Sequence, residues 1–224
     1  MRSMTRVVGA LAGTFAGLVV LLGRAEAVPD ECVGAIGALL SKIEITVGAC
    51  PAESTPLLAS GQTTCSDIPG AIVDCAGTGQ DGEIRAGVVQ RYTSHDNGTV
   101  TDLNTGLTWE KKTAANMFDA YTWDEAFVYV AGLNAARFGG HDDWRVPNIR
   151  ELQSLIDFGK FDPAVAPEFN DCDHGSCTVS GSYWSSTSAF SAPILAWRVN
   201  FVDGFQITGG KTFTIRVRAV RGGV

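Results

Sequence analysis

Residues 121–157 read YTWDEAFVYVAGLNAARFGGHDDWRVPNIRELQSLID, and this stretch contains the start signals of two helices. Thr122 stands three residues before Glu125, and Asn148 stands three residues before Glu151. In each pair the first side chain can cap a helix, while the glutamate can accept a hydrogen bond from the N–H of the cap. The stretch therefore predicts two helices joined by a short connection.

Apolar residues follow each start signal at helical spacing. The first stripe contains Trp123, Ala126, Phe127, Val130, Ala131 and Leu133–Asn134, and the second contains Ile149, Leu152, Leu155 and Ile156. Gly139-Gly140 is expected to end the first helix. Both helices should therefore pack one face against a core.

The connection between the helices is HDDWRVP, residues 141–147. Trp144 is a large apolar side chain that we expect to fill the core, and Arg145 is expected to pair with a carboxylate. Pro147 fixes the backbone just before the second cap and favours an extended conformation for the residue before it. We interpret the connection as a structural hinge, with a binding loop as the alternative.

Residues 1–27 have the pattern of a signal peptide. Two arginines precede the apolar run Val7–Leu22, and Ala25-Glu26-Ala27 is a small-x-small cleavage site. The run is short for a membrane span. The pattern predicts a mature chain that starts at Val28, has no membrane span, and is exported to the periplasm, the cell surface or the extracellular space.

The charge of the chain narrows the classes of partner. The full sequence has a net charge of −7. The predicted signal holds three arginines and one glutamate, so the mature chain has 14 basic and 23 acidic residues and a charge of −9. An acidic protein is a poor general ligand for nucleic acid or anionic membrane. We therefore expect a surface glycan or protein as partner; the sequence does not indicate the oligomeric state.

All six cysteines lie in the mature chain, which in an exported protein indicates disulfides. Fifteen connectivities exist for six cysteines. We favour the pairing of sequence neighbours, because each pair lies in its own local segment. This pairing gives Cys32–Cys50, Cys65–Cys75 and Cys172–Cys177.

The mature chain divides into three parts by composition. Residues 28–60 are expected to form a small helical segment tied by Cys32–Cys50, and residues 61–84 a Gly/Thr/Asp-rich linker with the Cys65–Cys75 loop. Residues 85–224 carry the periodic patterns and are long enough to bury one core. The sequence therefore predicts one folded domain at the C-terminal end.

A hairpin is expected early in this domain. Asn97-Gly98 and Asn104-Thr105-Gly106 are turn signals. The paired strands would be Thr99–Asp102 and Leu107–Glu110, with Val100, Leu107 and Trp109 in the core. The segment after the helices is long and irregular, and its expected anchors are Phe161, Val165, Phe169 and the Cys172–Cys177 disulfide.

Two pairs of acidic residues could either coordinate calcium or form hydrogen bonds in local turns. Asp96 and Asp102 flank the first turn, and Asp171 and Asp173 lie beside the predicted Cys172–Cys177 loop. The spacing is not that of an EF-hand, and turn chemistry is the commoner use of aspartate. No other cofactor is predicted.

The C-terminal third alternates apolar and polar residues, as strands do. Trp197, Val199 and Phe201 should share one face, opposite Arg198 and Asn200; Phe213, Ile215, Val217 and Ala219 should share another, opposite Arg216 and Arg218. Arg198, Lys211, Arg216, Arg218 and Arg221 would then concentrate positive charge. This basic face is either solvated or a contact surface for an anion or sugar.

Tyr183 and Trp184 form an aromatic pair in the strand SYWSSTS. Their rings can stack on a sugar, or they can pack inward while the serines and threonines face out. Together with Arg198, Arg216 and Arg218 they are the candidate ligand-binding residues. No catalytic motif occurs in the sequence, so we predict a non-catalytic protein.

Five segments, taken in order, resemble the Lcl C-terminal domain family. They are TVTDLNTGLTWE, TWDEAFVYVAGLN, DDWRVPNIRELQSLID, YWSSTS and IRVRAVRG, and the resemblance covers roughly Asp81 to Gly222. It implies an exported or cell-surface bacterial domain; in the collagen-like adhesin that names the family it implies binding of sulfated glycans and a trimer. The order of elements is also similar to C-type lectin-like folds, including formylglycine-generating enzymes, whose chemistry would need free thiols at Cys172 and Cys177.

Together these observations predict an α+β domain in which two helices pack on a twisted, mainly antiparallel sheet with a long stapled loop, as in C-type lectin-like folds. The expected function is that of an adhesin-like binding module for glycan or another surface ligand. A structural envelope component and an enzyme of the formylglycine-generating type are the alternatives.

Overall fold

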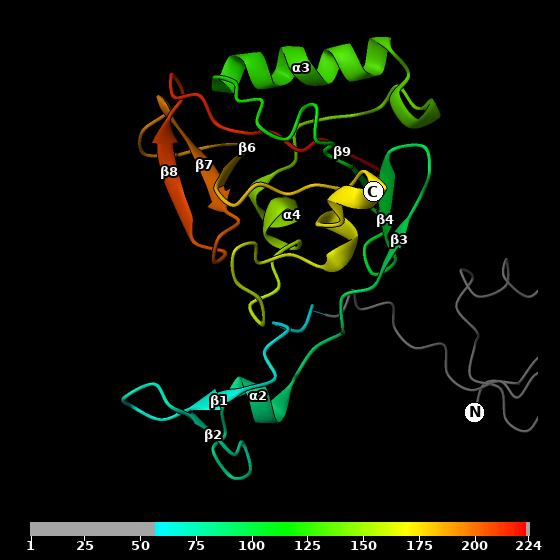
Figure 1. Cartoon of the computed structure of the whole chain (residues 1–224). Helices are drawn as coiled ribbons and strands as arrows, with labels where there is room; N and C mark the ends of the chain where they lie inside the picture. Colours follow the sequence, from blue (N-terminus) through cyan, green and yellow to red (C-terminus); the bar gives the residue numbers. More distant parts are fainter. Residues whose placement is uncertain (1–56, 223–224) are drawn as a thin grey trace, which may run out of the picture. The chain divides into compact units, whose positions relative to one another are not determined.

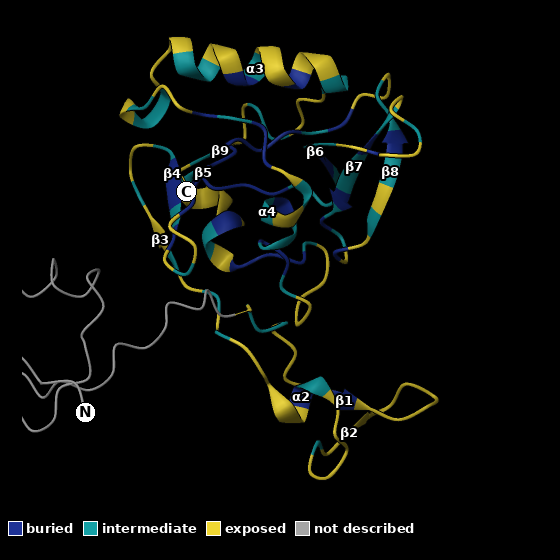
Figure 2. Cartoon of the chain, turned by 180° about the vertical axis from the view of Figure 1, so that it is seen from behind, coloured by how far each residue is buried: buried dark blue, intermediate teal, exposed yellow. Residues whose placement is uncertain are grey.

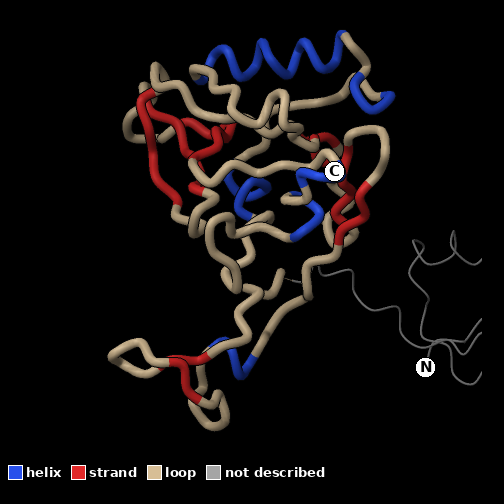
Figure 3. The backbone as a smooth tube through the Cα atoms, viewed as in Figure 1, coloured by secondary structure: helices blue, strands red, loops and turns tan. Residues whose placement is uncertain are grey.

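The computed structural model of the protein describes residues 57–222 (Figure 1). The predicted signal peptide, the Cys32–Cys50 pair and most of segment 28–60 lie outside these residues. The fold is mixed α/β with antiparallel strand pairs in three sheets, and Figure 3 shows irregular segments between most elements. The strands are β1 (Cys65–Ser66), β2 (Ile72–Val73), β3 (Tyr92–Ser94), β4 (Thr99–Asp102), β5 (Thr108–Glu110), β6 (Ser182–Ser188), β7 (Leu195–Asn200), β8 (Gln206–Gly210) and β9 (Val220–Arg221).

Among the described residues the helices are few, and only α3 is longer than two turns. They are α2 (Asp81–Ile84), α3 (Trp123–Ala135) and α4 (Ile149–Gln153), with single 3-10 turns η1 (Phe138–Gly140), η2 (Pro167–Phe169) and η3 (Cys172–His174). In this part of the chain no helix has the length and apolar character needed to cross a membrane.

The predicted hairpin lies in the sheet with strand order β3-β4-β5-β9. β4 pairs antiparallel with β5, and Val100 stands opposite Trp109. Gly106 in the connecting turn has φ +72°, a conformation that glycine adopts without strain. Val100, Leu107 and Trp109 are all buried, so both the hairpin and its core residues are confirmed.

The start of α3 is a capping box between Thr122 and Glu125, as predicted. Ala126 and Val130 are buried against the core. Phe127 and Ala131, however, are exposed, so the predicted apolar stripe was too wide. Figure 2 shows the reason: only a narrow line of α3 faces the rest of the domain, and its outer face is open to solvent.

The hinge between α3 and α4 is structural. Trp144 is buried, and its Nε1 donates to the carbonyl of Phe138 at 2.9 Å. Arg145 pairs with Glu151 through two hydrogen bonds of 2.6 and 2.7 Å, rather than with either neighbouring aspartate. Glu151 also accepts from the N–H of Asn148 in the second capping box. One carboxylate therefore fixes both the hinge and the start of α4, and the adjacent Pro147 is buried.

The β6-β7-β8 sheet is covered on both faces. Neighbouring residues of a strand point to opposite faces, so Tyr183 and Trp184 enter different parts of the core. Tyr183 packs in the apolar cluster that contains Leu152 of α4, and Trp184 packs in the cluster that contains Ala126 of α3. The clusters that contain α4 and α3 therefore lie on opposite faces of this sheet, and α4 lies between it and the β3-β4-β5-β9 sheet (Figure 1). We call the two sides of the β6-β7-β8 sheet the α4 face and the α3 face.

Residues 213–221 were predicted to form one alternating strand, and they instead connect the two larger sheets. Ile215 bridges to the chain before α3, Arg216 bridges to β6, and β9 pairs with β5. Ile215, Val217 and Ala219 are buried as expected, whereas Phe213 is 57% exposed. The predicted facial alternation therefore holds only where the segment passes through the interior.

The long segment after α4 is held by three of its four predicted anchors. Val165 and Phe169 are buried, and a disulfide joins Cys172 to Cys177. Phe161 is 73% exposed, so its assignment as an anchor was wrong. The buried Cys177 donates its N–H to a carbonyl of the chain that follows β5, at 2.6 Å, which ties the stapled loop to the core.

The Cys65–Cys75 disulfide is present and joins two short strands, β1 and β2. Its neighbour α2 carries Glu83, whose carboxylate accepts the N–H groups of Gly77 and Gly79 at 2.7 Å each. These two hydrogen bonds lower the pKa of Glu83. This part of the chain is thus organised by a disulfide and a carboxylate cap rather than by an apolar core.

Candidate functional site

The aromatic pair that the sequence offered for sugar stacking lies inside the core. Tyr183 and Trp184 are both fully buried. The Tyr183 hydroxyl donates to the carbonyl of Val179 at 3.1 Å, and Trp184 Nε1 donates to the carbonyl of Tyr121 at 3.0 Å. The proposed ligand contact is therefore wrong for both residues, because neither ring can be reached from solvent.

The predicted arginine face is not assembled. Arg218 is fully buried and donates to the carbonyls of Glu110 and Cys177 at 3.2 and 2.9 Å. Arg198 stands opposite Trp184, and Arg216 stands beside Tyr183. Because directly paired residues share a face, Arg198 and Arg216 lie on opposite faces of the β6-β7-β8 sheet.

The remaining two cations of that predicted face also have partners. Lys211 donates to the Ser188 hydroxyl at 2.7 Å and lies 3.7 Å above the Trp123 ring. Arg221 pairs with Asp143 at 2.6 Å, and this hydrogen bond lowers the pKa of Asp143. Arg218, Lys211 and Arg221 therefore make separate contacts, and Arg198 and Arg216 lie on opposite faces of the sheet.

Arg218 belongs to a closed ionic cluster rather than to a ligand site. Glu110 accepts from Lys112 Nζ at 2.8 Å and from the Tyr129 hydroxyl, and all but Tyr129 are almost fully buried. Desolvation lowers the pKa of Lys112 and of Arg218. Desolvation, followed by the Glu110 charge, raises the pKa of Tyr129. Glu110, Lys112 and Arg218 are therefore shielded from solvent and hold the interior together.

Two of the four aspartates proposed as calcium ligands, Asp102 and Asp171, make local contacts. Asp102 is buried and accepts from the N–H of Asn104 at 2.8 Å and from the Thr105 hydroxyl at 2.7 Å. Asp171 pairs with His174, while Asp96 and Asp173 are exposed. Across residues 57–222 no three His, Cys, Asp or Glu side chains come together in a way that could hold a metal ion. The contacts of Asp102 and of Asp171 are those of local turns.

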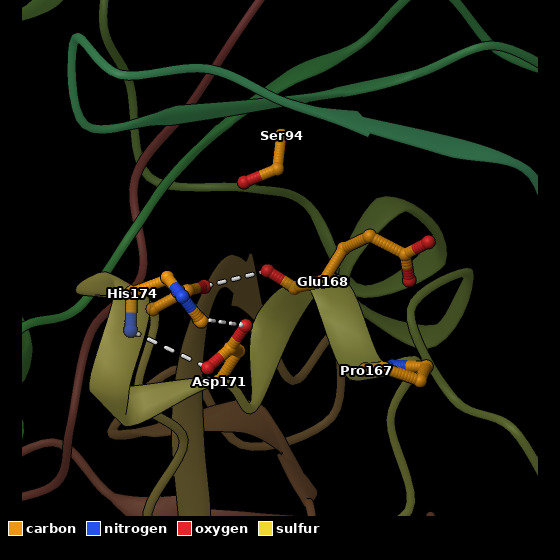
Figure 4. Close-up of a pocket in the computed structure, with 6 residues that line it drawn as sticks. Ser94, Pro167, Glu168, Asp171 and His174 are labelled. Carbon is orange, nitrogen blue, oxygen red and sulfur yellow. Dashed lines mark hydrogen bonds and ion pairs between the residues drawn. The ribbon is translucent and has the colours of Figure 1, made fainter.

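A hollow of about 190 Å³ lies beside the stapled loop, and Figure 4 shows the residues that line it. It is lined by Ser94, Pro167, Glu168, Asp171, His174 and Ser176. His174 Nδ1 lies 2.7 Å from an oxygen of Asp171, and Ser176 donates to the carbonyl of Glu168 at 2.6 Å. Among the described hydroxyl groups none is hydrogen-bonded to His174, so the hollow holds an Asp–His pair without an activated nucleophile.

A larger hollow of about 350 Å³ lies between α4 and the strands β7 and β8. We call it the α4 groove, and it is lined by Ile149, Arg150, Gln153, Trp197 and Gln206. Trp197 is half-buried, Arg150 is exposed, and the two glutamines are partly exposed. An aromatic ring and three hydrogen-bonding side chains therefore meet at one accessible place.

The local structure of α4 explains the position of Arg150 and Gln153. The capping box at Asn148 starts the helix, and the N–H of Ile149 donates to the Thr187 hydroxyl of β6 at 3.1 Å. Leu152 of the same helix turn is buried. Since Leu152 points into the core, the side chains of Arg150 and Gln153 point along the rim of the helix towards the groove.

Strand register explains the position of Trp197. It pairs with Thr208, and Val199 pairs with Gln206. Trp197 and Val199 are two residues apart on one strand, so both side chains lie on the α4 face with Gln206. The helix covers Val199 completely and leaves the ring of Trp197 partly open.

The polar side chains of the groove are available for a ligand. Among the described residues, the side chains of Arg150, Gln153 and Gln206 make no hydrogen bond and no ion pair. Such a set can donate and accept hydrogen bonds around a ring that stacks on Trp197. None of these four residues was predicted from the sequence as a ligand contact, although alternation along the strand and the Arg150–Gln153 spacing on the helix were signals that could have found them.

Comparison with known proteins identifies the family. The model of the Lcl C-terminal domain matches residues 98–221, which is more than half of the chain. No curated protein matches the chain. The matched range contains the hairpin, both capping boxes, the hinge and the α4 groove, in the order that the sequence resemblance indicated. The chain belongs to the Lcl C-terminal domain family.

Proposed function

We propose that this chain is an exported, non-catalytic, adhesin-like module that binds glycan in the α4 groove. The observation that carries the proposal is the accessible ring of Trp197 beside three polar side chains that have no partner among the described residues. Aromatic stacking combined with multiple hydrogen bonds suits the apolar face and the hydroxyl groups of a sugar.

Two further observations support this proposal. The signal-peptide pattern of residues 1–27 and the disulfides fit an exported protein. Cys172 and Cys177 are joined in a disulfide, which weighs against formylglycine-type chemistry at that position. The likeness to C-type lectin-like folds remains part of the proposal and is not needed for the site.

A glycan array with the mature protein tests this function. We expect the wild type to bind a defined class of sugar, and Trp197→Ala to weaken that binding at least about tenfold, because it removes a contact of about 1.5 kcal/mol or more. Arg150→Ala should also weaken binding. Matched controls are Phe190→Ala, which removes a fully exposed aromatic ring elsewhere, and Arg91→Ala, which removes an exposed arginine outside the groove.

The array is run with calcium and again with a chelator. Binding should be unchanged, because the groove contains no carboxylate. Loss of binding with chelator, or binding that Trp197→Ala leaves intact, would contradict the assignment of the site. A blank array with folded, oxidised protein would instead support the structural envelope role.

A further inference from the structure

We infer that the α4 groove continues along β8 to a second aromatic platform, Phe158, and that its ligand is a linear oligosaccharide rather than a single sugar. This inference rests on the proposed glycan-binding function. It concerns the length of chain that the site recognises, and it uses contacts that lie beyond the hollow itself.

The chain from α4 onward runs alongside β7 and β8. At one end, the N–H of Ile149 donates to the hydroxyl of Thr187, close to the level of Trp197 on the sheet. At the other end, the N–H of Asp157 donates to the carbonyl of Ala164, and the N–H of Ala164 donates to the carbonyl of Phe201. The segment from 149 to 158 therefore borders the α4 face from Trp197 to the turn between β7 and β8.

The ring of Phe158 packs against that turn. Gly204 has φ +82°, and a Cβ placed on it would lie 2.9 Å from Cε1 of Phe158. The absence of a side chain at Gly204 thus lets the ring rest against the backbone of the turn. Phe158 is still 43% exposed, so part of its ring remains open to solvent.

The two aromatic platforms are separated by more than one sugar ring. Trp197 lies in β7, and Phe201 directly follows the last residue of that strand, which corresponds to about 13 Å at the usual rise per residue. Gly204, against which Phe158 packs, lies further along in the same turn. Gln206 pairs with Val199, halfway along this distance, and Gln153 follows Arg150 by three residues on the helix side. Neutral amides therefore line the interval between Trp197 and Phe158.

This arrangement matches an extended chain of pyranose rings. A single ring stacked on Trp197 cannot also contact Phe158 at that separation. The amide groups between the platforms both donate and accept hydrogen bonds, which suits hydroxyl or acetamido groups along an uncharged chain. We therefore expect affinity to grow with chain length until the ligand reaches Phe158.

The test uses ladders of linear β-1,4-linked glucose, N-acetylglucosamine, xylose and mannose, from monosaccharide to hexasaccharide. The ladder that binds is titrated calorimetrically against the mature protein. For the wild type, affinity should rise along the ladder and then level off. Phe158→Ala should remove the gain of the long members, about tenfold, and leave the short members unchanged, whereas Trp197→Ala should weaken every member.

Two additional variants keep this test decisive. Phe158→Leu retains apolar contact with Gly204 but loses the flat ring, and it should also lower affinity for long members only. Phe161→Ala removes a more exposed phenylalanine of the same loop and should change nothing. Near-UV circular dichroism confirms that each variant is folded.

The outcomes separate the two proposals. Affinity that is independent of length, binding confined to branched glycans, or a uniform loss with Phe158→Ala would overturn the linear-chain inference while glycan binding at Trp197 stands. If the wild type binds no glycan at all, the proposed function itself fails, and this inference fails with it.

Discussion

Arg218 and Arg150 illustrate how the same side chain serves opposite purposes in this fold. Arg218 is fully buried and donates to two carbonyls and to the Thr178 hydroxyl at 2.8 Å. The guanidinium carbon of Arg218 lies 5.2 Å from the centre of the Phe169 ring. Arg150 is exposed and has no partner among the described residues. The first holds the interior together, and the second is available to a ligand.

Replacement of Arg218 by alanine should therefore reduce stability. The change leaves a cavity and unpaired carbonyls, and we expect the free energy of unfolding to fall by about 3 kcal/mol or more. Arg150→Ala should stay within about 0.5 kcal/mol of the wild type. Urea unfolding followed by tryptophan fluorescence measures both. Equal stability of the two variants would show that the buried guanidinium contributes nothing.

At the scale of single elements, α3 depends on the capping box at its N-terminus. The Glu125 carboxylate accepts from the N–H and from the hydroxyl of Thr122, each at 2.8 Å. The backbone hydrogen bond, followed by that of the hydroxyl, lowers the pKa of Glu125. The first turn of α3 is therefore fixed by an ionised carboxylate.

The pH dependence of this cap follows from linkage. Because the pKa of Glu125 is lower in the folded state than in the unfolded state, the cap stabilises the protein above the unfolded value, about 4.3, and loses its effect as the pH falls through the folded value. Glu125→Ala should therefore lower Tm at pH 7 and have a smaller effect at pH 3. Asp124→Ala, at the adjacent exposed position of the same turn, is the control. An effect of Glu125→Ala that does not change with pH would exclude a contribution from the charge.

The hinge between α3 and α4 was predictable from the sequence, but the ion-pair partner of its arginine was not. The sequence places Arg145 beside two aspartates, yet in the structure it bonds Glu151, six residues on. Hydrogen bonding by Glu151 raises the pKa of Arg145. Asp143 instead pairs with Arg221. Arg221 belongs to β9, and the pairing of β9 with β5 brings it close to Asp143. The sequence therefore predicted that Arg145 pairs with a carboxylate, and only the folded chain determined that this carboxylate is Glu151.

At the scale of the whole described chain, the two disulfides serve different regions. Cys65–Cys75 closes a hairpin of two-residue strands, whereas Cys172–Cys177 closes a loop whose buried end bonds to the chain after β5 and to Arg218. All five tryptophans of the sequence lie within the residues matched by the family model. Tryptophan fluorescence therefore reports on that domain.

This difference gives a test with matched double variants. Cys172→Ala with Cys177→Ala should lower the unfolding free energy seen by tryptophan fluorescence by roughly 2 kcal/mol, the usual effect of a short disulfide loop. Cys65→Ala with Cys75→Ala should change it less, because that loop has little contact with the domain core. Equal effects of the two pairs would mean that both loops unfold with the tryptophan-containing core.

What the sequence determined by itself is the local structure: both capping boxes, the hairpin turn, the two observed disulfides and the buried Trp144. Each depends on residues close together in the chain, so spacing and side-chain chemistry suffice. Alternation also separated Trp197 from Arg198, whereas Tyr183 and Trp184 were expected either both to contact a sugar or both to pack inward. Only the tertiary structure decided which faces are covered, because an apolar cluster lies on each side of the β6-β7-β8 sheet, one containing residues of α4 and the other residues of α3. That packing buries Tyr183, Trp184 and Arg218. It leaves Trp197 partly exposed beside Arg150, Gln153 and Gln206, because α4 is too short to cover the whole face.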